Sequence, residues 1–351
     1  APLWTRDESL APVQPILDAQ PRAIRALSFD FFDTLVCRLC ANPSDLFVET
    51  GRRLRAAGLL REPWTPEEFH AVRVAADEKA RDRARQQKKS AEVTLADIYA
   101  ELAPVLTDTT AACRLEFEVE RAFCFLNPSV ASLVEHARLL GLKVVVASDT
   151  YFRRPQLEQL LRDGGLDPAT FDAILASCEL RKAKWSGDLY PELFRRLDLH
   201  PSEILHIGDN VHADVQAAAQ YGVETIHYYR TDPHLDAIFD GERQLRGTGP
   251  RPAASLNALR VLAARLNPEA TDPARDGALT FGPVLARYAD WAVERFKAAG
   301  VRTVLALMRE GEVLGSLLAR AAEHAGLQLN VVPCFASRLA TARAAMTEVT
   351  P

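Results

Sequence analysis

The chain of 351 residues is 48% hydrophobic and 25% charged, proportions that are ordinary for a globular protein and exclude a disordered or collagen-like chain. Its 42 basic and 47 acidic residues give a net charge of −5, which excludes a strong basic field for nucleic acid or an anionic membrane. It contains no 18-residue apolar run that could span a membrane and no apolar leader, which predicts a cytoplasmic protein.

Residues 1–25 are expected to form an N-terminal extension, and the first predicted strand is the apolar run at residues 26–32. A block of helices follows at residues 36–125, in which we expect no strand. Its helices are expected to begin at the capping residues Ser44, Thr65 with Pro66, Thr94 and Thr110. The basic run at residues 81–89 ends the second helix, where it matches the helix dipole, so we expect a solvated helix end rather than a binding patch.

Strands and helices then alternate. The predicted strands are residues 143–147, 172–176, 204–208 and 223–229, and the predicted helices are residues 128–140, 155–163, 188–197 and 213–220. This alternation predicts an α/β fold with a parallel sheet covered by helices on both faces, which the strand at 26–32 must join. The core therefore comprises residues 26–35 and 126–232, and residues 36–125 are an inserted, all-helical cap.

The remainder of the chain is predicted to be a linker at residues 233–255 followed by a C-terminal α/β segment at residues 256–351. The segment's predicted helices are residues 255–266, 280–299 and 312–324, and its predicted strands are residues 303–308 and 328–335. A single β-α-β unit cannot bury both faces of its sheet. We therefore expect this segment either to pack on the core or to open a larger domain.

Polar residues collect where four of the predicted parallel strands end, which is where function gathers in an open parallel sheet. In chain order they are Asp30, Phe32 and Asp33; Ser148 and Asp149; Lys182 and Lys184; and Asp209, Asn210 and Asp214. Two or three carboxylates can hold Mg²⁺, and a lysine and a hydroxyl can bind a phosphoryl group that a carboxylate attacks. Each residue alone would more often be a turn or a helix cap, but four such sets in order favour phosphoryl chemistry.

These residues resemble the four motifs of the haloacid-dehalogenase-like (HAD) hydrolase superfamily. The matching segments are Asp30-Phe-Phe-Asp-Thr34-Leu35, Ser148, Lys184 (with Lys182 as the weaker candidate), and Gly208-Asp209-Asn210 with Asp214. The resemblance covers residues 26–230. It implies a Rossmann-like parallel-sheet core with a helical cap inserted after the first motif, and the helical block above fills that place.

The resemblance also implies a role for each residue. Asp30 would be the nucleophile. The residues implied to hold or orient Mg²⁺ are Asp30, the backbone carbonyl of Phe32, Asp209, Asn210 and Asp214. The residues implied to bind the transferred phosphoryl group are Ser148, Lys184 and Thr34.

Position 32 departs from the family's phosphatases, which carry there a second Asp that protonates the leaving group and then activates water. Here the residue is Phe32, and along an extended backbone Asp33 would point the other way. General acid–base help is worth about 10²–10⁴-fold, so phosphatase turnover is expected to be weak. The family's dehalogenases also lack the second Asp, but they do not keep the Gly-Asp motif, so Gly208 and Asp209 argue against dehalogenation.

A closer resemblance is to a bacterial subgroup of predicted hydrolases found beside or fused to glycosyltransferases of surface-polysaccharide synthesis, in which Phe at position 32 is usual. The segments that carry it are residues 28–36, Arg38, Pro43, residues 148–151, Met308-Arg-Glu-Gly311 and Ser337-Arg338. The sequence thus predicts a Mg²⁺-dependent hydrolase acting on a phosphorylated metabolite or glycan intermediate, with a glycosyltransferase domain or protein as a partner. The alternative is a catalytically weak or silent module in a polysaccharide-biosynthesis protein.

Overall fold

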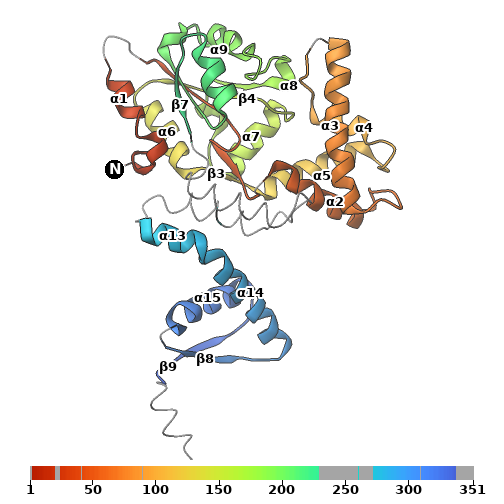
Figure 1. Cartoon of the computed structure of the whole chain (residues 1–351), viewed down its shortest axis with the longest axis vertical. Helices are drawn as coiled ribbons and strands as arrows, with labels where there is room; N and C mark the ends of the chain where they lie inside the picture. Colours follow the sequence, from red (N-terminus) through yellow and green to blue (C-terminus); the bar gives the residue numbers. More distant parts are fainter. Residues whose placement is uncertain are drawn as a thin grey trace, which may run out of the picture. The chain divides into compact units, whose positions relative to one another are not determined.

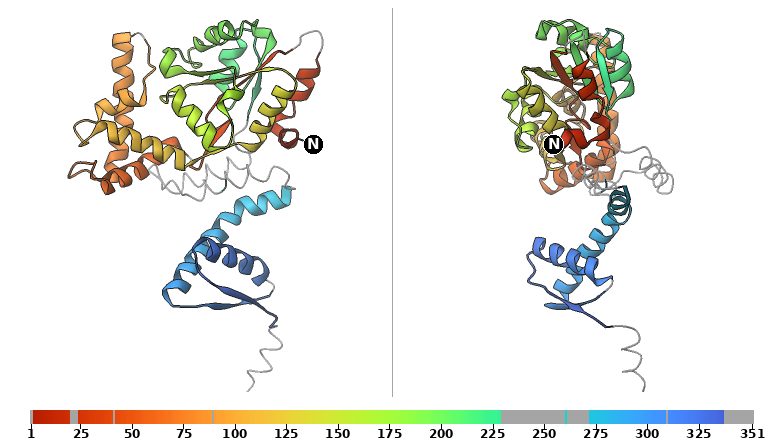
Figure 2. Two further views of the ribbon diagram at one scale, coloured as in Figure 1. Left: turned by 180° about the vertical axis from the view of Figure 1, so that it is seen from behind. Right: turned by 90° about the vertical axis from the view of Figure 1, so that its left-hand side faces the viewer.

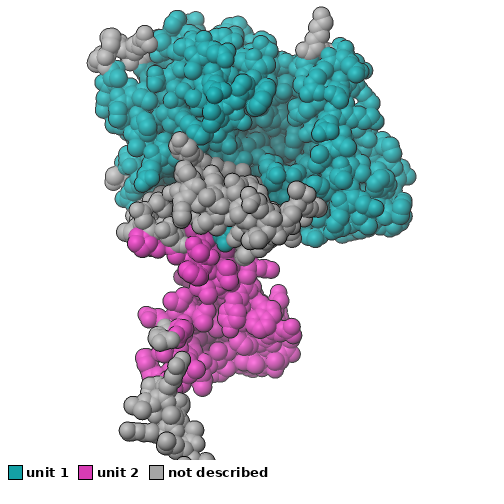
Figure 3. Space-filling model, in the orientation of Figure 1, with its two compact units in different colours: residues 1–269 teal, residues 270–351 magenta. Residues whose placement is uncertain are grey.

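The computed structural model describes residues 2–19, 24–40, 42–88, 90–228, 260, 272–308 and 310–336. The chain divides into two compact units, residues 1–269 and 270–351, and each is described by itself (Figure 3). The predicted linker, the helix predicted at 255–266 apart from Arg260, and the tail residues Arg309, Ser337 and Arg338 lie outside the described residues.

A five-stranded parallel sheet forms the centre of the first unit (Figure 1). In spatial order its strands are β5 (Ala173–Ala176), β4 (Lys143–Ser148), β1 (Ala26–Phe29), β6 (Ile204–Gly208) and β7 (Glu224–His227). In the register, Phe29 lies opposite Val146 on one side and Ile207 on the other, so the strands end at the same edge. The predicted α/β fold with a parallel sheet is confirmed.

Helices cover both faces of this sheet, which explains why its strands read as nearly unbroken apolar runs. One face, which includes Phe29 and Val146, packs with α6 (Pro128–Leu139) and α7 (Arg154–Asp163). The other face, which includes Val145, packs with α9 (Leu189–Leu197) and α10 (Ala217–Ala219). The N-terminal turns and α1 (Val13–Asp18) also bury apolar side chains in the first of these layers, namely Trp4, Leu10 and Val13.

The insertion consists mainly of four helices that lie to one side of the sheet in Figure 1 and in the left view of Figure 2. They are α2 (Leu46–Ala56), α3 (Pro66–Lys88), α4 (Leu95–Glu101) and α5 (Thr109–Ala122). Thr65 and Thr94 cap α3 and α4 as predicted, accepting the amides of Glu68 and Asp97 at 3.2 Å each. The cap of α5 is Asp108, two residues before the predicted start at Thr110.

The prediction that residues 36–125 contain no strand is wrong at both ends of the insertion. β2 (Val36–Arg38) pairs antiparallel with β3 (Cys124–Leu126), so a short ribbon lies where the chain leaves the core and returns to it. Each of these strands is three residues long, which is too short for a period of two to show in a sequence. Shorter helical turns are η1 (Leu3–Arg6), η2 (Glu8–Leu10), η3 (Pro43–Asp45), η4 (Pro168–Thr170), α8 (Ser177–Leu180), η5 (Pro201–Glu203) and η6 (Val211–Gln216).

The second unit contains the predicted β-α-β arrangement. Its elements are α13 (Asp272–Thr280), α14 (Gly282–Ala298), β8 (Thr303–Leu307), α15 (Gly311–His324) and β9 (Asn330–Cys334), and the two strands pair in parallel. α14 and α15 share an apolar cluster with one side of the strands. Leu305 and Leu307 lie on the other side of the strands, and they are 62% and 60% exposed. None of the helices in the described ranges has the length and apolar character needed to cross a membrane.

Candidate active site

Three carboxylates meet at the carboxyl edge of the sheet. Asp30 follows β1, while Asp209 and Asp214 follow β6, and carboxylate oxygens of the three lie within 4.8 Å of one another. The Asp30 amide donates to the Ile207 carbonyl at 2.9 Å, so the β1–β6 pairing itself places Asp30 beside the end of β6. Asp30 and Asp214 are buried and Asp209 is half-buried.

Asp214 is held in this group by a close approach to the backbone. A Cβ at Gly208 would lie 2.3 Å from Asp214 Cγ, so only glycine fits at this end of β6. The Asn210 amide donates to Asp214 Oδ2 at 2.9 Å, while Asn210 Oδ1 caps η6 by accepting the amides of His212 and Ala213. The backbone amide of Asn210 therefore orients Asp214, and the side-chain oxygen of Asn210 caps η6. The helix predicted at 213–220 begins here as a π-turn, a form often found at functional sites.

A buried lysine connects two of the acids. Lys184 Nζ donates to Asp30 Oδ1 and to Asp214 Oδ1. Burial by itself would lower the pKa of Lys184, but the two carboxylates outweigh it and raise that pKa, so the ammonium stays charged. Lys182, the weaker candidate, instead lies on the outside and pairs with Glu192 at 3.5 Å.

The two acids bound by Lys184 differ in their ionisation. Burial raises the pKa of Asp30 well above its ordinary value, and although Lys184 opposes this shift, Asp214 and Asp209 add to it. Burial has the same tendency at Asp214, but Lys184 and His206 outweigh it and lower that pKa. A further positive charge among the three carboxylates would therefore favour the ionised form of Asp30.

His206 is a site residue that the sequence analysis missed. It is fully buried in β6, its Nδ1 lies 2.8 Å from Ser28 Oγ, and its Nε2 lies 3.1 Å from Asp214 Oδ1. Burial lowers the pKa of His206, which favours a neutral ring that donates to Asp214 and accepts from Ser28. The signal in the sequence was a lone imidazole inside an otherwise apolar strand.

Ser148 ends β4 and is buried at the same edge of the sheet. Its neighbour Asp149 binds the loop that carries Lys184, because Asp149 Oδ1 accepts the Lys184 amide at 2.7 Å and Oδ2 accepts the Trp185 amide at 2.9 Å. In the sequence Asp149 stands at the end of a predicted strand, and no pattern there indicates a role for it. The structure assigns it the positioning of the Lys184 loop.

The turn after Asp30 contains Phe32, the residue that stands in place of the second Asp of the family's phosphatases. Asp33 adopts a left-handed conformation with φ 61°, so the backbone is not extended there, and its amide donates to the Val36 carbonyl at 2.7 Å. The Phe32 ring is buried beneath the guanidinium of Arg38, whose Cζ is 3.7 Å from the ring centroid. Thr34 is buried, and its Oγ1 has no hydrogen-bond partner among the described residues.

Arg38 joins this turn to the insertion. Its Nε donates to Glu120 Oε1 of α5 at 2.6 Å, and its Nη1 lies 3.6 Å from Asp33 Oδ2. The Asp33 carboxylate is thus paired with Arg38.

The donor set at the sheet edge fits a hard divalent cation. It consists of carboxylate oxygens from Asp30, Asp209 and Asp214, and such oxygen-only sets suit Mg²⁺. Lys184 and Ser148 lie at the same edge and supply a positive charge and a hydroxyl for an anionic group. The arrangement can bind a phosphate ester and present the Asp30 carboxylate to it.

A protein-family model matches more than half of this chain. The family model for haloacid dehalogenase-like hydrolases matches residues 24–222, a range that includes the three acids, Ser148 and Lys184. No curated protein sequence matches the chain.

Among solved structures, L-2-haloacid dehalogenase from Xanthobacter autotrophicus is similar at 21% identity and a TM-score of 0.45, over 76% of this chain and 99% of that one. CbbY from Rhodobacter sphaeroides, in complex with phosphate, is similar at 21% identity and a TM-score of 0.39, over 60% of this chain and 89% of that one. A predicted phosphoglycolate phosphatase from Haemophilus somnus 129PT is similar at 19% identity and a TM-score of 0.39, over 61% of this chain and 91% of that one.

Proposed function

Since this chain belongs to the haloacid dehalogenase-like hydrolases, we propose that it is a Mg²⁺-dependent phosphohydrolase or phosphotransferase acting on a phosphorylated metabolite or glycan intermediate. The observation that carries this proposal is the group of Asp30, Asp209 and Asp214, whose carboxylate oxygens lie within 4.8 Å of one another, with Lys184 bound to two of them. The residues that would hold Mg²⁺ are these three acids and the Phe32 carbonyl. The bound ion would neutralise charge on the phosphate.

In the proposed reaction, a carboxylate oxygen of Asp30 attacks phosphorus and the bond from phosphorus to the leaving oxygen breaks. Lys184, Ser148 and Thr34 bind the oxygens that do not react. The leaving oxygen takes its proton from water, because position 32 supplies no acid. A second water then attacks phosphorus and releases phosphate and the Asp30 carboxylate, or an acceptor hydroxyl takes the place of that water.

The Phe32 ring beneath Arg38 favours one alternative, a weak or silent module. The resemblance to the glycosyltransferase-associated subgroup supports placing such a module in a polysaccharide-biosynthesis protein, with a glycosyltransferase as its partner. The two proposals differ in whether phosphate is released at all.

The test is phosphate release from a panel of phosphate monoesters by the purified chain with Mg²⁺ and with chelator. We expect Mg²⁺-dependent release that Asp30→Asn abolishes. The control is Asp198→Asn, since Asp198 is exposed and has φ 53°, a conformation that Asn tolerates. Release that survives Asp30→Asn contradicts the mechanism. No release, together with no binding of Mg²⁺ or beryllofluoride, supports the silent module, and chloride release from 2-chloropropionate would support dehalogenation.

A further inference from the structure

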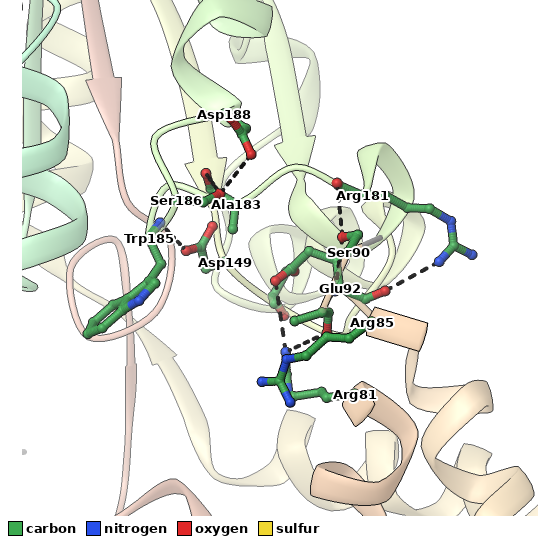
Figure 4. A pocket seen from close by; sticks show the side chains of 12 residues that line it. Arg81, Arg85, Ser90, Glu92, Asp149, Arg181, Ala183, Trp185, Ser186 and Asp188 are labelled. Atoms are coloured by element: carbon green, nitrogen blue, oxygen red, sulfur yellow. Dashed lines mark hydrogen bonds and ion pairs between the residues drawn. The ribbon is translucent and has the colours of Figure 1, made fainter. Parts of the chain in front are cut away.

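A cavity of about 430 Å³ lies between the insertion and the core (Figure 4). On the insertion side it is lined by Arg81 and Arg85 of α3 and by residues 90–92. On the core side its wall includes Asp149 and Trp185. Figure 4 shows Trp185 and Arg81 on different sides of this space.

The core wall of the cavity is the same loop structure that carries the proposed phosphoryl-binding residues. Asp149 directly follows Ser148, and Trp185 directly follows Lys184. Because Asp149 accepts the amides of both Lys184 and Trp185, these segments form one connected wall. A substrate whose phosphate is bound at Ser148 and Lys184 therefore has this cavity beside it, with room for a leaving group.

The basic residues of the run at 81–89, which we expected to form a solvated helix end, lie on different faces of α3. Arg81 and Arg85 are four residues apart and so share one face of α3, which lines the cavity. Arg83 lies on another face, where its Nη1 is 2.6 Å from Glu101 Oε1 of α4. Five of the nine residues in this run are basic, and among those whose side chains the structure describes only Arg81 and Arg85 border the cavity.

The acidic side chains that line the wall already accept hydrogen bonds from other groups of the protein. Asp149 already accepts two amides, Asp188 lies 3.1 Å from the Ser186 hydroxyl, and Glu92 accepts from Ser177. Burial also raises the pKa of Glu92, which disfavours its charged form.

Arg81 and Arg85 each have guanidinium N–H groups without a hydrogen-bond partner among the described residues. Arg81 uses Nε for Asp77 and Nη1 for the Ala91 carbonyl, and that Nη1 also lies 3.9 Å from Glu92 Oε1. Arg85 uses Nη1 for Asp82. The Nη2 of Arg81 and the Nε and Nη2 of Arg85 have no hydrogen-bond partner among the residues that the structure describes. Planar guanidinium donors of this kind match carboxylate and phosphate oxygens. Across the cavity from them, Trp185, which is 60% exposed, offers a flat apolar surface.

We propose that this cavity selects phosphate esters whose leaving group carries a second anionic group, a carboxylate or a phosphate. Arg81 and Arg85 bind that group, and Trp185 packs against the carbon skeleton that joins it to the transferred phosphate. The inference rests on the proposed function for its substrate, but the cavity's affinity for anions can be measured without turnover.

The kinetic test uses matched pairs of substrates that differ in the second anion: glycerol 3-phosphate against 3-phosphoglycerate, and fructose 6-phosphate against fructose 1,6-bisphosphate. In the wild type we expect the second anion to raise kcat/KM by about tenfold or more in at least one pair, mainly through KM. Arg85→Gln should remove most of that advantage. The matched control is Arg83→Gln, which removes a similarly exposed arginine from another face of α3 and should leave the advantage unchanged.

The outcomes separate this inference from the proposed function. If the wild type hydrolyses the simple esters but gains nothing from a second anion, or if Arg83→Gln and Arg85→Gln act alike, the inference is overturned and the function stands. If no ester is hydrolysed, calorimetric titration of 3-phosphoglycerate and fructose 1,6-bisphosphate decides. Binding that weakens about tenfold in Arg85→Gln only would support the cavity without the chemistry, and no binding would overturn both.

Discussion

At position 32 an aromatic ring and a guanidinium stand where the family's phosphatases place a carboxylate. Phe32 contacts Phe31, Phe152 and the face of the Arg38 guanidinium, so its ring has apolar neighbours and a cation above it. Arg38 is in turn fixed by Glu120 and Asp33. The residue is therefore part of a packed group, and its replacement changes both the chemistry and the packing.

We expect Phe32→Asp to raise kcat for a simple phosphate monoester by about tenfold or more, because it restores a group that can protonate the leaving oxygen. Arg38 would keep the new carboxylate close to the site. The measurement is steady-state phosphate release with p-nitrophenyl phosphate and Mg²⁺. Phe32→Asn has the same size without the acid, so an equal gain in that variant would show that space, and not proton transfer, was missing.

A second residue-scale prediction concerns Asp149. Asp149→Asn keeps one acceptor but replaces the other with an amide group that faces the Trp185 or Lys184 N–H, so the Lys184 loop should shift. We expect kcat to fall by about tenfold to a hundredfold with an intact fold, since small displacements of a reacting group are costly. Phosphate release and circular dichroism together check this.

The control for Asp149 is Asp172→Asn. Asp172 Oδ2 also accepts a backbone amide, that of Val144 at 2.7 Å, but at the opposite end of β4. Equal losses of kcat in the two variants would mean that Asp149 acts on stability and not on the position of Lys184.

At the scale of elements, a buried ion pair holds the helices of the insertion together. Arg73 of α3 is fully buried, and its Nη2 donates to Glu116 Oε1 of α5 at 2.7 Å. The Tyr99 hydroxyl of α4 donates to the other oxygen of Glu116 at 2.6 Å. The Arg73 guanidinium also lies 5.2 Å from the ring centroid of Tyr151, which belongs to the loop after β4. One ionic group thus connects three helices with the core.

Removing the charge of Glu116 should therefore destabilise the first unit strongly. We expect Glu116→Gln to lower the free energy of unfolding by about 3–5 kcal/mol, because it leaves Arg73 charged and buried without its partner. Urea unfolding followed by circular dichroism gives the value. Glu118→Gln, on the same helix but 59% exposed and paired with Arg121, should change it by less than about 0.5 kcal/mol; similar losses in both would contradict the assignment.

The sequence predicted most of the core elements for a simple physical reason. Strands buried on both faces are apolar runs, and their ends carry the polar groups that meet at one sheet edge, so the grouping of Asp30, Asp209 and Asp214 follows from topology. The β2–β3 ribbon was missed because three residues carry no period. The buried partner of Asp214, His206, and the cavity face formed by Arg81 and Arg85 depend on packing between segments far apart in the sequence.

At the scale of the whole molecule, the two units differ in how completely they bury their sheets. In the first unit, helices cover both faces of the five-stranded sheet, and every residue proposed for phosphoryl transfer lies between positions 30 and 214. In the second unit, β8 leaves Leu305 and Leu307 more than half exposed, and Phe335 is 85% exposed. Apolar surface of this extent is a feature of binding faces or of incomplete domains.

We therefore expect a fragment of residues 1–269 to fold alone and to retain the proposed Mg²⁺-dependent phosphate release within about twofold of the full chain. The reason is that the five-stranded sheet, the helices on both of its faces and the proposed site all lie within this fragment. Residues 270–351 alone should bind a hydrophobic dye such as anilinonaphthalene sulfonate, because no described residue of that unit covers the side of the sheet that holds Leu305 and Leu307. The measurements are unfolding midpoints, kcat and dye fluorescence for both fragments and the full chain. A 1–269 fragment that folds with the same midpoint but has lost its activity would show that the second unit supplies part of the site.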